Sequence, residues 1–112
     1  MTSVRIVKSK VTGYRSFEVS GHSGYAEEGS DIICAAVSTA TELILGILDN
    51  FSVDTRLNIR EDTAYVLCEI SQTDGNACKK LEITKVLDGF AEYIQDVSGV
   101  YPKYLKCILM QE

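Results

Sequence analysis

The chain has 112 residues, of which 46% are hydrophobic and 24% are charged. This is the composition of a globular domain, and it excludes disorder as the main state. Eleven Lys and Arg against sixteen Asp and Glu give a net charge of −5, which argues against a general nucleic-acid binder and favours a basic partner. The length fits one domain over residues 1–112.

The sequence also predicts where the protein resides. Its uninterrupted apolar runs are only a few residues long, so we expect no membrane span. The N-terminal residues alternate between apolar and polar side chains and do not form the apolar block of a signal peptide. We therefore expect a cytoplasmic protein in a reducing compartment, with its four cysteines present as thiols.

The first half of the chain changes from a strand pattern to a helix pattern. Alternating apolar residues around a Thr12-Gly13 turn predict a β-hairpin over residues 2–20. Three glycines within residues 21–30 predict a loop. Residues 31–50 then predict a helix that is apolar nearly all round and so buried on more than one side, with Ser30 or Asp31 as its cap. Its main apolar stripe is expected to be Ile33, Val37, Ala40, Ile44 and Leu48.

The second half repeats this order of elements. Residues 56–59 and 64–70 flank a turn at 60–63 and predict a second hairpin. Asp74 or Asn76 is expected to cap a second helix that runs to about Ser98, ended by Gly99 and Pro102. Residues 104–110 predict a last strand. The fold class is therefore α+β in the order ββαββαβ, with two helices packed on a largely antiparallel five-stranded sheet.

The spacing of the cysteines argues against a metal or redox site. Cys34, Cys68, Cys78 and Cys107 form no Cys-x-x-Cys pair, and the sequence has a single histidine, His22. Cys68 and Cys107 lie among apolar residues of predicted strands, where a thiol packs as a small apolar side chain. Cys78 adjoins two lysines that would lower its pKa, but we interpret it as a partly buried residue without a chemical role.

Cys34 differs because it falls in the first turn of the predicted helix. There the helix dipole stabilises a thiolate, and free N–H groups, including that of Cys34, could hold an oxyanion. His22 stands at the other end of the glycine-rich loop, and a neutral imidazole can take the proton of a thiol. Asp31 would either cap the helix or orient His22. From the residue types alone, Cys34 as a core residue and His22 as a loop residue remain open alternatives.

Residues 21–38 resemble the ribosomal-processing cysteine protease family, Prp. The matching pattern is Gly-His, a loop with glycine, and then Asp-Ile-Ile-Cys-Ala-Ala-Val-Ser, and the likeness extends to length and element order over nearly the whole chain. The resemblance implies a single cysteine protease domain over residues 1–112, with Cys34 as the nucleophile and His22 as the general base. Gly21, Asp31 and Ser38 match further motif positions and would support the site.

The resemblance also implies a substrate and a setting. Members of the family remove a short N-terminal extension from a bacterial large-subunit ribosomal protein during ribosome maturation. The family is cytoplasmic and homodimeric, and it needs no metal or organic cofactor. We also expect no direct contact with nucleic acid and none with a membrane.

Two further expectations concern the loop and the first helix. The loop, with Ser23, Gly24, Tyr25 and Gly29, is expected to be mobile and to close over a bound peptide. The alternative function is a non-catalytic ribosome-associated binding or assembly protein, which would grip a protein tail with the same loop and keep Cys34 in its core. A helix apolar on all sides needs more cover than one sheet readily provides, which favours a homodimer over full burial within one subunit.

Overall fold

The structure is a computed structural model that describes residues 1–22, 31–71 and 77–112. Its elements follow the predicted order ββαββαβ, so the predicted fold class is confirmed. They are β1 (Thr2–Ser9), β2 (Gly13–Ser20), α1 (Ile32–Asn50), β3 (Thr55–Arg60), β4 (Tyr65–Ile70), α2 (Ala77–Val100) and β5 (Leu105–Gln111). The expected turn at residues 73–76 and its capping residues lie outside the described residues.

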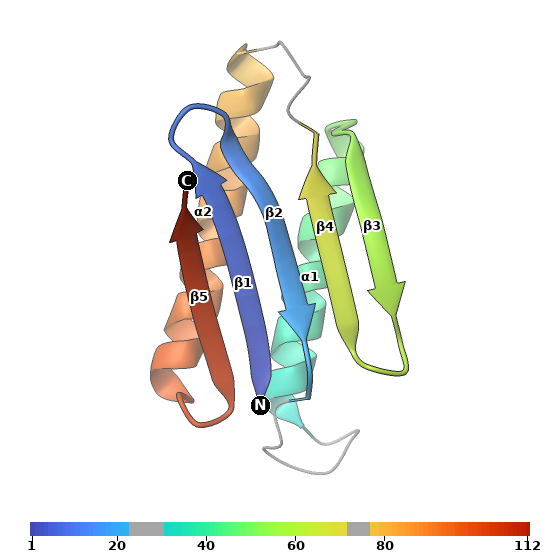
Figure 1. Ribbon diagram of the computed structural model, residues 1–112, viewed down its shortest axis with the longest axis vertical. Coiled ribbons are helices and arrows are strands. Elements are labelled where there is room, and N and C mark those ends of the chain that lie inside the picture. The colour runs from blue at the N-terminus through green and yellow to red at the C-terminus, as the bar shows by residue number, and fades with distance from the viewer. Residues whose placement is uncertain (23–30, 72–76) are drawn as a thin grey trace.

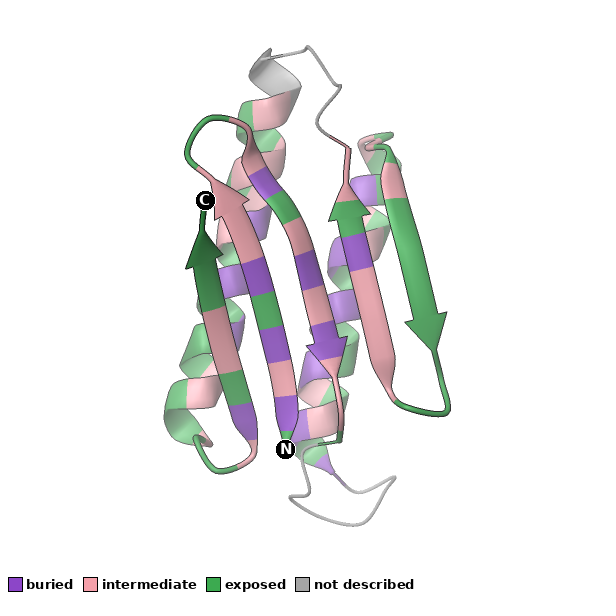
Figure 2. Ribbon diagram, viewed as in Figure 1, coloured by how far each residue is buried: buried purple, intermediate pink, exposed green. Residues whose placement is uncertain are grey.

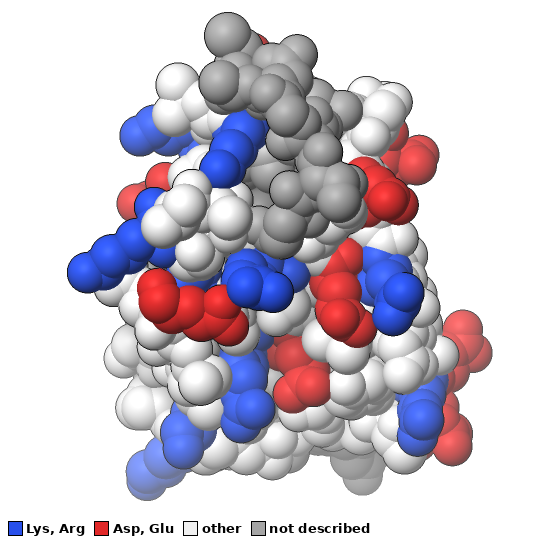
Figure 3. Space-filling model, turned by 45° about the horizontal axis from the view of Figure 1, so that its top comes forward, with Lys and Arg blue, Asp and Glu red and all other residues white. Residues whose placement is uncertain are grey.

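The five strands form one sheet in the order β3-β4-β2-β1-β5. All neighbouring strands are antiparallel except β1 and β5, which are parallel. Both helices cover the same face of this sheet, α1 behind β2 and β4, and α2 behind β1 and β5 (Figure 1). On the other face, Lys and Arg side chains are interspersed with Asp and Glu (Figure 3), the pattern of a face turned toward solvent.

The core lies between the sheet and the two helices. Alternate residues of the central strands are buried (Figure 2), as in the cross-strand pair Ile6 and Phe17. Phe17 contacts Phe90 of α2, with 5.1 Å between ring centroids. The second helix turns one face to the core, where its central apolar residues are buried and the flanking ones pack against it. The buried residues of α2 are Leu87, Phe90, Ala91 and Ile94.

The first helix buries one stripe and exposes the rest of its apolar surface. The stripe is the predicted one except that Thr41 replaces Ala40 among its buried residues. The Thr41 hydroxyl donates to the Val37 carbonyl oxygen at 2.7 Å, which satisfies a polar group that burial would otherwise destabilise. Leu43 is 64% exposed, so the helix is not buried on several sides within one chain. Helix α1 is long and apolar enough to cross a membrane, but the core helices of soluble domains often meet the same criterion.

Several element boundaries differ from the prediction by one or two residues. Helix α2 continues through Gly99 to Val100, because an exposed glycine inside a helix costs only about 1 kcal/mol. The Tyr101 N–H still donates to the Val97 carbonyl oxygen, and Pro102 then prevents continuation. In the second hairpin Arg60 belongs to β3, and Ala64 lies in the turn with a φ of 50°.

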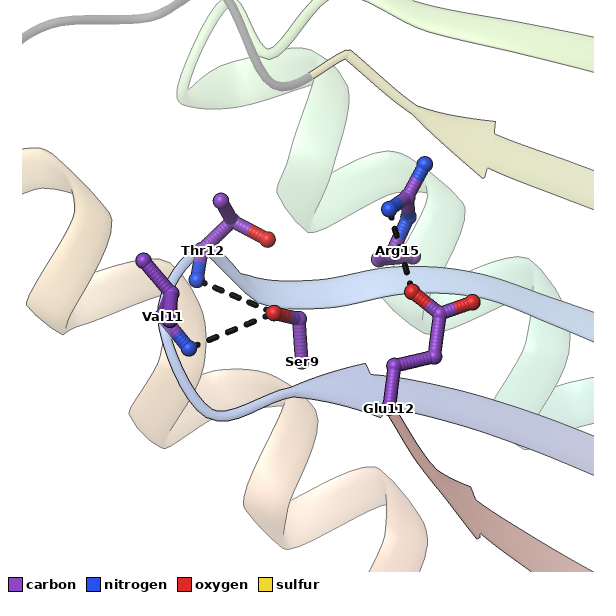
Figure 4. Close-up of polar contacts among 5 residues, drawn as sticks. All are labelled: Ser9, Val11, Thr12, Arg15 and Glu112. Carbon is purple, nitrogen blue, oxygen red and sulfur yellow. Dashed lines mark hydrogen bonds and ion pairs between the residues drawn. The ribbon is translucent and has the colours of Figure 1, made fainter.

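Side-chain contacts fix the end of the sheet that carries the first hairpin turn. The Ser9 hydroxyl oxygen accepts from the N–H groups of Val11 and Thr12 at 3.2 and 3.3 Å (Figure 4). Arg15 of β2 forms an ion pair at 3.0 Å with Glu112, beyond the end of β5 (Figure 4). The opposite end of the sheet, where β2 leads toward α1, carries the candidate site.

Candidate active site

The last residue before His22 holds a conformation that only glycine adopts easily. Gly21 has a φ of +82°, and a Cβ added there would lie 2.7 Å from the Met1 carbonyl oxygen. The Thr2 hydroxyl donates to the Gly21 carbonyl oxygen at 3.3 Å. The end of β2 is therefore packed tightly against the start of β1, and this contact fixes the direction in which His22 leaves the sheet.

Asp31 determines where α1 and its cysteine begin. Its buried carboxylate oxygen Oδ1 accepts from the N–H groups of Ile33 and Cys34, each at 3.0 Å. The structure therefore assigns Asp31 the capping role that the sequence left open between Ser30 and Asp31. Ser30 lies outside the described residues.

This cap corrects one expectation about catalysis. The sequence allows the Cys34 N–H to hold an oxyanion, but in the structure it donates to the Asp31 carboxylate. The N–H of Ile33 donates to the same oxygen, and the N–H of Ala35 donates to the Asp31 carbonyl oxygen. In this conformation none of these three N–H groups is available to a substrate.

The structure brings the two predicted chemical groups together. Cys34 Sγ lies 4.0 Å from His22 Nδ1, although the residues are twelve positions apart in sequence. Cys34 is partly buried and His22 is exposed, so both can be reached from solvent. A distance of 4.0 Å is long for proton transfer, but unliganded sites commonly tighten when substrate binds.

Both residues line a groove of about 550 Å³ that runs between α1 and the β3–β4 hairpin. Cavities of this size accommodate small ligands or a few residues of a peptide. From α1 the groove is lined by Ser38 and Glu42, and from the hairpin by Ile59 and Val66. The motif included Ser38 but not the other three. The spacing of Glu42, four residues after Ser38 on the same helix face, was the one signal available for it.

The remaining cysteines lack the surroundings of a nucleophile. Cys68 is completely buried in the core, and burial raises the pKa of its thiol to about 11. Burial also raises the pKa of the Cys107 thiol, which packs against the same core. The predicted packing role of these two residues is confirmed, whereas the side chain of Cys78 lies outside the described part of the chain. Among the described residues, no group of three His, Cys, Asp or Glu could hold a metal ion.

The predicted substrate loop is not part of this description. Ser23, Gly24, Tyr25 and Gly29 lie outside the described residues, so its closure over a peptide stays a prediction. The other predicted site residues line the groove between α1 and the β3–β4 hairpin: Gly21, His22, Asp31, Cys34 and Ser38. They do so because β2 ends, and α1 begins, at the same edge of the molecule (Figure 1).

A thiol next to an imidazole, at the start of a helix and facing a groove, is an arrangement typical of cysteine proteases. Comparison with known families gives the same class. The model of the family described as cysteine protease Prp matches residues 1–106, and the chain belongs to this family. The resemblance of residues 21–38 is thereby confirmed.

Individual relatives agree with this assignment. The ribosomal processing cysteine protease Prp of Bacillus subtilis (strain 168) is 28% identical in an alignment of 111 positions that covers 95% of each chain. The fold also matches that of the essential ribosomal processing protease Prp of S. aureus, which was solved with a covalently linked product peptide. The TM-score is 0.84 and the identity 17%, over 97% of this chain and 99% of that one. SMU.848 of Streptococcus mutans matches with a TM-score of 0.80 and 22% identity over 100% of this chain and 96% of that one.

Proposed function

We propose that this protease removes the short N-terminal extension of a bacterial large-subunit ribosomal protein during ribosome maturation, with Cys34 as the nucleophile and His22 as the general base. The observation that carries the proposal is the 4.0 Å approach of Cys34 Sγ to His22 Nδ1 in the wall of a groove that can accept a peptide. The relative from Bacillus subtilis is named as a ribosomal processing protease. A net charge of −5 also suits a basic ribosomal protein as substrate.

The reaction is acyl transfer through the thiol. His22 Nδ1 takes the proton of Cys34, and the thiolate attacks the carbonyl carbon of the scissile peptide bond. The tetrahedral intermediate collapses as the C–N bond breaks, and the imidazolium gives its proton to the leaving amine. Water then attacks the thioester while His22 takes a proton from it. The C–S bond of this second tetrahedral intermediate then breaks, the carboxylic acid leaves, and the imidazolium of His22 returns a proton to the Cys34 thiolate.

The oxyanion of each tetrahedral intermediate needs a hydrogen-bond donor. The first N–H groups of α1 serve this purpose only after the Asp31 carboxylate has released them, because that carboxylate binds two of them. A carboxylate in this place would also repel the negative charge that develops on the substrate oxygen. The donor is therefore either an N–H that the Asp31 carboxylate releases when substrate binds, or one that this carboxylate does not bind.

The test is cleavage of a synthetic peptide that spans the ribosomal extension. Cys34→Ala and His22→Ala are each expected to abolish cleavage, and Cys107→Ala, which changes a thiol remote from the groove, is expected to leave it intact. The proposal is wrong if Cys34→Ala and His22→Ala both cleave at the wild-type rate. In cells, the mass of the ribosomal protein's N-terminus should show the uncut extension when only Cys34→Ala enzyme is present.

The alternative function, a non-catalytic ribosome-associated binding protein, has less support. It requires Cys34 to pack in the core, whereas Cys34 is partly exposed and lines the groove beside His22. Iodoacetamide at neutral pH separates the two functions, since a nucleophilic thiol reacts quickly and a spectator thiol slowly.

The proposal includes a cytoplasmic location and a homodimer. The exposed side of α1, with Ile32 at 54% and Leu43 at 64% exposure, supports an interface between two copies. A sedimentation experiment at micromolar concentration that finds only single chains would remove the homodimer from the proposal.

A further inference from the structure

The wall of the groove formed by α1 carries three polar side chains in one line. Cys34, Ser38 and Glu42 follow each other at intervals of four residues, so they lie on the same face of the helix. Ser38 and Glu42 are exposed, and within the described part of the chain no hydrogen bond or ion pair engages either side chain. This line continues from the reacting thiol along the groove.

The facing wall of the groove carries an apolar strip beside the charged residues Arg60 and Glu61. Ile59 of β3 is 54% exposed and lies directly beside its cross-strand partner Val66 of β4. Val66 in turn pairs with Val19 of β2, which also lines the groove. Side chains of an extended peptide point alternately to opposite sides. One set would therefore contact this apolar strip while the other set faces Ser38 and Glu42.

Two carboxylates reach the groove from α1 and its cap, Asp31 and Glu42. Asp31 is buried and accepts from two backbone N–H groups, so Glu42 is the exposed one. Arg60 and Glu61 also line the groove, but they are consecutive residues and their charges offset each other. Helix α1 contains no Lys or Arg, so no cation of the same helix compensates Glu42. An exposed carboxylate in the α1 wall attracts a cationic side chain of the set that faces it.

We propose that Glu42 is a specificity-determining residue that selects a Lys or Arg of the substrate, three to four residues from the cleaved bond. The eight positions from Cys34 to Glu42 span about 12 Å along a helix. An extended peptide covers about 3.3 Å per residue, which places the selected side chain about 3–4 residues away. The inference rests on the proposed function, because it assumes that the cleaved bond lies at Cys34.

A charge scan of the substrate tests this assignment. Peptides spanning the ribosomal extension carry Lys or Glu at one position at a time, from two to five residues on either side of the cleaved bond, and kcat/KM is measured for each. Wild-type enzyme is expected to prefer Lys over Glu at the third or fourth position. Glu42→Lys is expected to lower this Lys-to-Glu ratio about tenfold, and Glu42→Gln to lower it by an intermediate factor. Added salt should weaken the preference, because the groove is open to solvent.

The matched control is Glu82→Lys, which makes the same change of charge at an exposed position of α2 that does not line the groove. It is expected to leave the Lys-to-Glu ratio within a factor of two of wild type. Equal shifts in both variants would mean that only net charge matters, and would overturn the role of Glu42. If wild-type enzyme cleaves none of the peptides, the proposed function itself is wrong and this inference falls with it.

Discussion

Replacing Gly21 with alanine is expected to separate the geometry of the site from the stability of the fold. Gly21 has a φ of +82°, and the new Cβ would meet the Met1 carbonyl oxygen at 2.7 Å. Because that oxygen belongs to the backbone at the start of β1, relief requires a shift of either the N-terminus or the segment that carries His22. Gly13→Ala is the matched control, since Gly13 has a φ of +84° and its nearest contact is the Thr84 hydroxyl at 3.2 Å, which can rotate.

The two substitutions share one energetic contribution and differ in another. A non-glycine residue in the left-handed region lowers the free energy of unfolding by about 1–2 kcal/mol, and this cost applies to both variants. A clash with packed backbone adds about 1–3 kcal/mol in Gly21→Ala alone. At roughly 4 °C per kcal/mol for a domain of this size, the melting temperature of Gly21→Ala should fall below that of Gly13→Ala by about 4–12 °C.

The activity of the two variants should differ more than their stability. A displacement of about 1 Å between reacting groups can reduce turnover about 100-fold, so Gly21→Ala is expected to lose about that much kcat/KM. Gly13→Ala should keep wild-type activity, with both assayed well below their melting temperatures. If Gly21→Ala has the melting temperature of Gly13→Ala and the kcat/KM of the wild type, the contact with Met1 does not position His22.

Three further changes test the cap, a polar contact and a buried thiol. Asp31→Ala should lower the free energy of unfolding by about 1–2 kcal/mol in chemical denaturation, while Asp31→Ser keeps an acceptor and restores most of it. Tyr14→Phe removes the hydroxyl that donates to Asp88 and holds the pKa of that carboxyl below 3.8. The part of its destabilisation that depends on the ionised carboxylate should be complete above about pH 4 and be lost as the pH falls through the lowered pKa, as denaturation across pH can measure. Burial raises the pKa of Cys68 from 9.0 to about 11, so between these pH values only unfolded chains ionise this thiol. The free energy of unfolding of the wild type, measured by denaturant titration, should therefore fall by up to about 2–3 kcal/mol from pH 9 to pH 11. Cys68→Val should lack that loss.

Most of the fold could be predicted because its signals are local. The alternation around Thr12-Gly13 and the helical stripe that starts at Ile33 each depend on neighbours within a few residues. The prediction is wrong at two positions where a residue type departs from its usual place in a helix. Gly99 remains inside α2 because an exposed glycine is tolerated in a helix, and Thr41 is buried because its hydroxyl finds a carbonyl within its own helix.

Only part of the candidate site could be predicted from local sequence patterns. Cys34 and His22 are joined by a short connection, so their approach could be predicted from sequence. The apolar strip at Ile59 comes from a hairpin that follows α1, and its place depends on how that hairpin pairs with β2 through β4. Nor can spacing reveal that a single carboxylate oxygen of Asp31 takes up two N–H groups.

The two ends of the sheet are built differently, and the difference favours chemistry at one of them. At the hairpin end, Tyr14 and Lys8 both bind Asp88 of α2, so side chains tie the sheet to the helix. At the other end, the contacts that set the site are a glycine packed on backbone and a carboxylate bound to backbone N–H groups. Cys34, His22 and Glu42 all line the groove at this end. The contacts around Gly21 and Asp31 therefore position this end through backbone atoms, whereas the hairpin end uses an ion pair between Lys8 and Asp88.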